Sequence, residues 1–195
     1  MSGLGRRFFR RDPREVAPDL LGKLLIHDVP AGTRRAGRIV EVEAYCGGND
    51  PAAHTFRGRT ARNDSMFADG GTLYVYRSYG IHWCANVVCS AADDGVAVLL
   101  RALAPVEGID AMYADRGGTA RQERDLCSGP GKLTQAMGIA GDHDGSDLVA
   151  GSNLSILDDG HPVGDVVQTT RVGISVAVHE PWRWYVAGDP NVSRR

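Results

Sequence analysis

The feature that most constrains the fold is the alternating run of residues 38–45, RIVEVEAY, which is typical of a β-strand. Successive side chains of a strand point to opposite faces of the sheet. The alternation predicts one face with Val40, Val42 and Ala44 and another with Ile39, Glu41, Glu43 and Tyr45. Because a half-buried carboxylate is costly unless it is paired or used, the second face predicts a buried ion pair or a functional site.

Arg101 is a second charge in an apolar context, because it lies within the strand-like run VAVLLRALAP. In one interpretation, Glu41 or Glu43 forms a structural ion pair with Arg101 or Arg38. In the other, burial raises the pKa of Glu43 toward the range of a general base. The residues alone leave both interpretations open.

The rest of the chain predicts an α+β fold. Two β-rich runs, 72–77 and 81–88, flank SYG, which is a hairpin signal with Gly80 at a positive φ. Helices are expected after Asp12-Pro13 and within CSGPGKLTQAMGI, and strands at 171–178 and 182–188. No βαβ rhythm is present, so we expect one domain, 1–195, with a mostly antiparallel sheet and a flexible basic arm at 1–7.

Composition narrows the class of protein. The chain has 195 residues, is 43% hydrophobic and carries a net charge of −2. No apolar run resembles a signal peptide or a membrane span, so we expect a cytoplasmic protein. The four cysteines lack the paired spacing of a zinc site, which favours reduced thiols and no metal or other cofactor. HWC and SGPGK lack the spacing of a zinc deaminase and a phosphate loop, respectively.

Arginine accounts for 20 of the 22 basic residues and clusters at 6–11, 34–38 and 57–62. One basic face would bind phosphate in spite of the net charge. Charge alone favours the alternative, a solvated arginine-rich surface. In the third cluster, Arg57, Arg59 and Arg62 are our candidates for contacts with a DNA backbone.

Aromatic residues supply a second signal. Tyr45, Tyr76 and His54 could form a slot that stacks a planar ring, although each could equally be an ordinary packed side chain. Tyr79 is expected at the exposed tip of the hairpin, where an aromatic ring can act as a wedge between DNA bases. The alternative is that Tyr79 folds back onto its own sheet.

Taken together, these residues resemble the alkyladenine DNA glycosylase family, the 3-methyladenine DNA glycosylases of the methylpurine type. The resemblance extends over nearly the whole chain. Its most specific blocks are GRIVEVEAY, DPAAHTFRGRTARN, MFADGGTLYVYRSYGIHWCANVV, AVLLRALAP and LCSGPGKLTQAMGI. It implies a curved antiparallel sheet with flanking helices and a protruding hairpin that inserts into DNA.

The resemblance also implies a role for each matched residue. Glu43 would be the general base that activates a water for attack on C1′, with Arg101 and the main-chain carbonyl of Val172 holding that water. Tyr45, His54 and Tyr76 would line the pocket of the flipped base, and Asn86 would exclude the exocyclic amine of guanine. Tyr79 would fill the gap left in the duplex.

The implied activity is base excision repair. The enzyme would remove alkylated or deaminated purines from double-stranded DNA and leave an abasic site. Lys23 and Lys132 are not placed like Schiff-base nucleophiles, which favours a monofunctional hydrolase. We expect a monomer, associated with the nucleoid if the source is bacterial. The alternatives are a hydrolase of free nucleosides, which needs no exposed Tyr79, and a non-catalytic damage-binding module.

Overall fold

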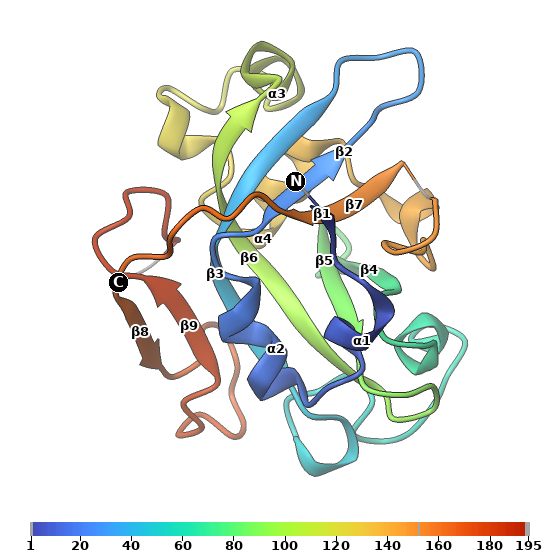
Figure 1. Ribbon diagram of the computed structural model, residues 1–195. Coiled ribbons are helices and arrows are strands. Elements are labelled where there is room, and N and C mark those ends of the chain that lie inside the picture. The colour runs from blue at the N-terminus through green and yellow to red at the C-terminus, as the bar shows by residue number, and fades with distance from the viewer. Residues whose placement is uncertain (1, 152, 194–195) are drawn as a thin grey trace.

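The fold is built on one antiparallel sheet, seen in a computed structural model that describes residues 2–151 and 153–193 (Figure 1). The strands are β1 (Ser2–Gly3), β2 (Leu24–His27), β3 (Arg35–Tyr45), β4 (Leu73–Ser78), β5 (His82–Cys89), β6 (Val96–Glu107), β7 (Leu154–Asp158), β8 (Val166–Thr169) and β9 (Arg183–Val186). Their order is β1-β7-β2-β3-β6-β5-β4, and β9 pairs with both β3 and β8. The expected α+β class with a curved antiparallel sheet is confirmed.

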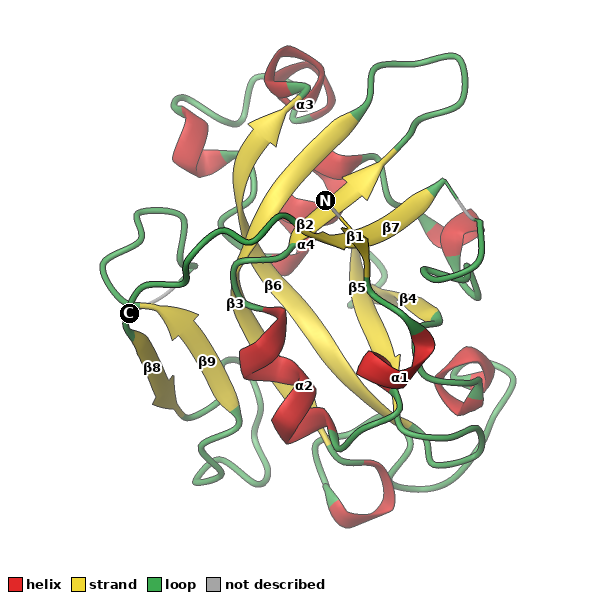
Figure 2. Ribbon diagram, viewed as in Figure 1, coloured by secondary structure: helices red, strands yellow, loops and turns green. Residues whose placement is uncertain are grey.

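Helices are short and lie around the sheet, as Figure 2 shows. The α-helices are α1 (Arg6–Phe9), α2 (Pro13–Leu20), α3 (Ile109–Asp115) and α4 (Pro130–Met137). Single 3-10 turns are η1 (Gly47–Asn49), η2 (Asp64–Phe67), η3 (Glu123–Asp125) and η4 (Gly141–His143). As expected, Asp12 caps α2, accepting a hydrogen bond from the Arg14 amide at 2.8 Å, with Pro13 in the first turn. Among the described residues, no helix is long and apolar enough to cross a membrane.

The sheet has a core face and a pocket face. Leu73, Val75, Val87, Val98 and Leu100 join α1, α2 and α4 in the main hydrophobic cluster. Their strand neighbours Tyr74, Tyr76, Asn86 and Leu99 line a pocket on the other side. Along β4, β5 and β6, alternate side chains therefore pack in the core and line the pocket, so different residues of the same strands stabilise the fold and form the site.

Two β-bulges modify the expected faces of β3. Ile39 pairs with Leu103, Glu41 with Ala102 and Val42 with Leu100, so Val40 is an extra residue on β3 and Arg101 is one on β6. The prediction for Ile39 and Val40 was therefore wrong, because Ile39 joins Val42 in the main core cluster and Val40 does not. A bulge redirects the side chains around it. The two bulges compensate, so Glu43 returns to regular pairing, opposite Leu99.

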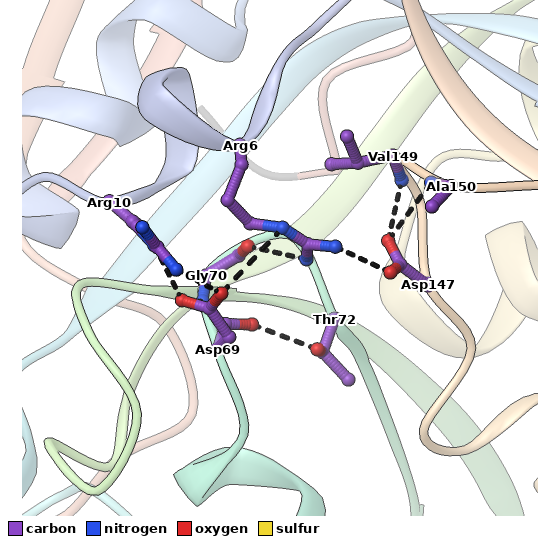
Figure 3. A network of polar contacts seen from close by, with 8 residues as sticks. All are labelled: Arg6, Arg10, Asp69, Gly70, Thr72, Asp147, Val149 and Ala150. Atoms are coloured by element: carbon purple, nitrogen blue, oxygen red, sulfur yellow. Dashed lines mark hydrogen bonds and ion pairs between the residues drawn. The ribbon is translucent and has the colours of Figure 1, made fainter.

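The N-terminal segment, expected to be a flexible arm, is attached to the domain. β1 pairs with β7. The Arg6 guanidinium donates to the Gly70 carbonyl at 2.9 Å and lies 2.5 Å from the Asp147 carboxylate (Figure 3). Arg10 makes a two-pronged pair with Asp69 at 2.7 and 2.8 Å. These contacts hold α1 against the loop before β4; Met1 lies outside the described residues.

Residues 171–178, expected as a strand, are irregular. Gly173 and Ala177 have φ values of +77° and +50°, and such left-handed residues interrupt a strand. The strand pairing next to β9 comes instead from β8. Residues 172–176 line the pocket described next.

Candidate active site

A pocket of about 760 Å³ opens on the pocket face of β3, β4, β5 and β6. Most of its remaining walls come from residues 51–54, the segment 128–132 that leads into α4, and residues 172–176. Of the predicted site residues, Tyr45, His54, Arg62, Tyr76, Tyr79, Asn86, Arg101 and Val172 all line it. The structure thus brings together residues that lie far apart in the sequence.

Glu43 lies immediately behind this pocket with 0% of its surface exposed. Its Oε1 accepts a hydrogen bond from the Val172 amide at 2.7 Å and lies 3.2 Å from Nη1 of Arg101. Its Oε2 accepts from the Tyr45 hydroxyl at 3.0 Å. All three partners line the pocket, so Glu43 is one layer beneath its surface. Val172 contacts the carboxylate through its amide, and the role predicted for its carbonyl, which concerns a water, stays a prediction.

Glu41 is equally buried but far more completely paired. Its Oε1 accepts from Nε of Arg101 and Nε of Arg183, each at 2.8 Å, and from the Ser193 hydroxyl at 2.9 Å. Its Oε2 accepts from the Ser193 amide at 2.7 Å. The expected ion pair with Arg101 therefore forms, and both glutamates share it. Arg38 pairs instead with Asp159.

The two carboxylates consequently have opposite electrostatics. Burial, only partly offset by Arg101, the Val172 amide and the Tyr45 hydroxyl, raises the pKa of Glu43 above its usual value. Burial acts in the same direction on Glu41, but Arg101, Ser193 and Arg183 together outweigh it and lower its pKa. Glu43 is therefore the group with the stronger tendency to take up a proton.

The backbone explains why this pair of charges is held so rigidly. The segment of β3 that carries Glu41 and Glu43 is bonded to β6 on one side and to β9 on the other. Arg101 is the bulged residue of β6, and its guanidinium reaches both carboxylates. A site on paired strands is positioned more accurately than one on loops.

Aromatic rings form one wall of the pocket. His54 meets Tyr76 edge to face, with ring centres 4.3 Å apart and an angle of 81°, while Tyr74 and Tyr76 are stacked at 5.5 Å. Nδ1 of His54 shares a hydrogen bond with the Tyr74 hydroxyl at 3.1 Å. Desolvation, assisted by the charge of Arg62, lowers the pKa of His54, which favours a neutral imidazole near pH 7. The His54 ring is thus perpendicular to a stacked pair formed by Tyr74 and Tyr76.

Asn86 is buried and lines the pocket, and on the sheet it pairs with Leu99, which in turn pairs with Glu43. Its side-chain amide donates to the Tyr74 carbonyl at 3.2 Å, which fixes its orientation. The side chain is therefore held in one orientation in the pocket wall.

Tyr79 lies at the tip of the β4–β5 hairpin, as predicted, and is 91% exposed. Tyr79 and Gly80 have φ values of +50° and +69°, and the Ile81 amide donates to the Ser78 carbonyl at 3.0 Å. This geometry is that of a type I′ turn. Ile81 is also exposed, by 67%, so the tip presents two apolar side chains to solvent.

Most of the clustered arginines are engaged within the protein. Arg59, a predicted DNA-backbone residue, pairs with Asp64 at 2.6 Å and with Asp93 at 3.0 Å. Arg62 donates to the Arg77 carbonyl at 3.1 Å and lines the pocket. Within the described ranges, neither Arg57 nor Arg62 forms an ion pair with a carboxylate. The positive charges of Arg57 and Arg62 are therefore not offset by a paired carboxylate, which leaves them suited to a phosphate contact.

Several site residues were not predicted from the sequence. Lys132, which the sequence did not place among the site residues, lines the pocket and donates to the Ser128 hydroxyl at 3.3 Å. Ser193, which completes the shell of Glu41, also lines it. Asp50 and Arg171 form a buried ion pair behind Tyr45. The pairs Asp50–Arg171 and Glu41–Ser193 span 121 and 152 positions, and no local pattern indicates such contacts.

The site therefore combines a buried, strand-borne carboxylate beneath an aromatic pocket with an exposed aromatic residue at a hairpin tip. The family model of methylpurine-DNA glycosylase (MPG) matches residues 7–190, and the chain belongs to this family. The similar proteins below bear the printed name "Putative 3-methyladenine DNA glycosylase".

One such relative, from Burkholderia lata, is 52% identical over 192 residues, covering 97% of this chain and 90% of its own. Another, from Methanoculleus marisnigri, is 51% identical over 192 residues, covering 96% of this chain and 97% of its own. A third, from Rhodopseudomonas palustris, is 50% identical over 190 residues, covering 97% and 90%. The resemblance inferred from the sequence blocks is confirmed.

Proposed function

We propose that this chain is a monofunctional DNA glycosylase that hydrolyses the N-glycosidic bond of alkylated or deaminated purines in duplex DNA. The observation that carries the proposal is the placement of Glu43. It is a fully buried carboxylate with a raised pKa, and all of its partners line one aromatic pocket. Perturbed carboxylates in such a position are typical of general bases.

In the proposed mechanism, Glu43 accepts a proton from a water that attacks C1′ of the damaged nucleotide. Among described residues, Oε2 accepts only from the Tyr45 hydroxyl, so it retains capacity for this proton. Burial raises the pKa of the Tyr45 hydroxyl, which keeps it protonated as a donor. Arg101 and the Val172 carbonyl are our candidates for holding the water, because both residues line the pocket beside Glu43.

The bond between C1′ and the base nitrogen breaks as oxocarbenium character develops on the sugar, and the Glu43 carboxylate stabilises that charge. A cationic base such as 3-methyladenine leaves directly. A neutral base such as hypoxanthine must gain a proton as it leaves. The product is an abasic site in an uncut strand.

Access to the pocket requires base flipping, because the target atom is unreachable inside a duplex. Tyr79 supports this step, since its ring is held in solvent by a rigid turn at the pocket rim. We assign Tyr79 the role of filling the gap in the stack. Tyr45, His54 and Tyr76 would hold the extruded base, and Asn86 would exclude a guanine amine.

The test is a single-turnover incubation with duplexes that carry one hypoxanthine or one 3-methyladenine. We expect strand cleavage only after alkali treatment, which reports an abasic site. Because Lys132 lines the pocket, sodium borohydride trapping is included; a covalent protein–DNA adduct would overturn the monofunctional assignment. No product from either substrate would contradict the assigned lesion class.

Two substitutions separate the alternatives. Glu43→Gln should lower the single-turnover rate of base release by about 10²- to 10⁴-fold or more and should retain lesion binding. If the wild type binds lesions without excising them, the chain is a damage-binding module. Tyr79→Ser should impair excision from duplex DNA, whereas a hydrolase of free nucleosides would retain full activity on a nucleoside such as inosine.

A further inference from the structure

Asp50 and Arg171 form an ion pair that is wholly buried behind the pocket. Both side chains are 0% exposed. Nη1 and Nη2 of Arg171 donate to the two Asp50 carboxylate oxygens at 2.5 and 2.8 Å, and Nη1 also donates to the Ala44 carbonyl at 3.0 Å. The pair therefore ties the loop after β3, the end of β3 and the segment at 171 to one another.

This pair has direct contact with the surroundings of Glu43. The Arg171 guanidinium lies over the Tyr45 ring, 4.7 Å from its centre. The Tyr45 hydroxyl is one of the donors to Glu43. The next residue after Arg171 is Val172, whose amide is the other hydrogen-bond donor to that carboxylate. One guanidinium thus fixes both hydrogen bonds that Glu43 accepts.

We propose that the Asp50–Arg171 pair is a positioning element for Glu43, holding the Tyr45 hydroxyl and the Val172 amide in place on its carboxylate. This inference rests on the proposed function of Glu43 as the general base. Neither Asp50 nor Arg171 is in the pocket lining, so both act through the residues that they hold.

Stability alone does not account for this arrangement. Replacing a buried ion pair by apolar residues is often neutral or stabilising. Nε of Arg171 is buried with no hydrogen-bond partner among the described residues, which adds a cost of its own. A positioning role explains why a planar, two-pronged side chain is retained here, since it satisfies Asp50 and Ala44 and stacks on Tyr45 at the same time.

The ionisation of Glu43 reports this positioning, because a donor that bonds the carboxylate favours its charged form. The other charged or titratable groups that act on Glu43 are Glu41 and Tyr45 on β3, Tyr76 on β4, Arg101 on β6, and Arg171. The substitution Arg171→Lys keeps the net charge and removes the planar, two-pronged group that bonds Asp50 and lies over Tyr45. A change in the pKa of Glu43 in this variant therefore reports lost geometry.

The chain offers a matched control on the same strand as Glu43. Arg38 bonds both carboxylate oxygens of Asp159 at 3.0 and 2.8 Å and the Gly22 carbonyl at 2.7 Å, which repeats the bonding pattern of Arg171. Neither Arg38 nor Asp159 lines the pocket. Arg38→Lys therefore reproduces the chemistry of the substitution away from the site.

The first readout is a pH titration of the Glu43 carboxyl carbon by ¹³C NMR, assigned through its absence in Glu43→Gln. We expect Arg171→Lys to raise the pKa of Glu43 by about one unit, equivalent to about 1.4 kcal/mol and consistent with a weakened hydrogen bond to a charged group. Arg38→Lys should leave it unchanged. This readout is independent of any activity, so it stands even if the proposed excision is not observed.

The second readout is the acid limb of the single-turnover excision rate. Arg171→Lys should move this limb to higher pH by the same amount and lower the rate about tenfold at pH values on the limb. Val172→Pro, which deletes the amide donor, should give the same shift. Combining Arg171→Lys with Val172→Pro should shift the limb little further than either substitution alone. If Arg171→Lys fails to fold, Asp50→Glu serves as the test variant. It displaces the Arg171 guanidinium and keeps the negative charge at position 50 and the positive charge at position 171. An unchanged pKa and limb in a folded, merely less stable variant would overturn the proposal.

Discussion

Glu41 and Glu43 lie two residues apart on one strand, and their removal should change stability in opposite directions. Glu41→Gln removes the negative charge that Arg101 and Arg183 share, and it replaces one of the two oxygens that accept from Ser193 by an amide group that cannot accept. Breaking a buried pair from one side costs about 3–5 kcal/mol. For a chain of this length, 1 kcal/mol corresponds to about 2–4 °C in Tm, so Glu41→Gln should lower Tm by about 6–20 °C.

Glu43→Gln should leave the stability equal to or above that of the wild type. Its carboxylate touches one guanidinium, that of Arg101, which Glu41 still neutralises in the variant. The raised pKa shows that the charged form of Glu43 is disfavoured in the fold. A glutamine of the same shape removes that cost and can still accept from the Val172 amide.

The free energy of unfolding should also depend on pH in opposite ways through Glu41 and Glu43. The pKa of Glu41 is lowered, so its stabilisation is complete above the unfolded value of about 4.3 and disappears as the pH falls through the folded pKa. The pKa of Glu43 is raised, so its cost is absent at low pH and develops as the pH rises from about 4.3 through the folded pKa.

The assay is urea denaturation of the wild type and the two variants, followed by tryptophan fluorescence at pH 7 and at lower pH. The difference between wild type and Glu41→Gln should shrink toward low pH, as should any gain from Glu43→Gln. Equal destabilisation by both substitutions would refute the reasoning, because it would make Glu43 a structural ion-pair residue like Glu41.

Three further results are expected. Tyr79→Ser should leave Tm unchanged, because the side chain is 91% exposed, and should slow excision from duplex DNA at least about tenfold, with a smaller effect on a single-stranded lesion; equal losses would place its role elsewhere. Arg57→Ala should reduce the slope of log K against log salt by about 0.9, and Arg59→Ala by less, because Arg59 is already paired with carboxylates. Identical slopes would contradict that distinction. Ser193→Ala should cost about 1 kcal/mol in urea denaturation, since its hydroxyl bonds both Glu41 and Arg101; an unchanged midpoint would show that the amide bond alone suffices.

Local sequence patterns predicted the elements that depend on local geometry. The alternation of residues 38–45 indicated β3, and SYG between two β-rich runs indicated the hairpin with Tyr79 at its tip. The bulges at Val40 and Arg101 could not be predicted, because they depend on how two strands pair rather than on either strand alone. That pairing decides which side chains face the pocket.

Charge patterns were less informative than apolar ones. The arginine clusters suggested either a basic face or solvated charges, whereas Arg6, Arg10, Arg38 and Arg59 are bonded to specific aspartates. Long side chains reach partners that no sequence spacing identifies. The segment at 171–178 looked like a strand because its apolar residues alternate. It does not extend, because two of its residues adopt left-handed backbone angles.

The Glu41–Ser193 and Glu43–Val172 contacts, which span 152 and 129 positions, also have a consequence for synthesis of the chain. A nascent polypeptide emerges with both acids long before the residues that satisfy them. Until residue 193 has been made, Glu41 lacks the two hydrogen bonds that Ser193 donates, and a partly synthesised chain cannot settle into the final structure. The centre of the sheet should therefore reach its final packing only after the segment that carries Ser193 has been synthesised.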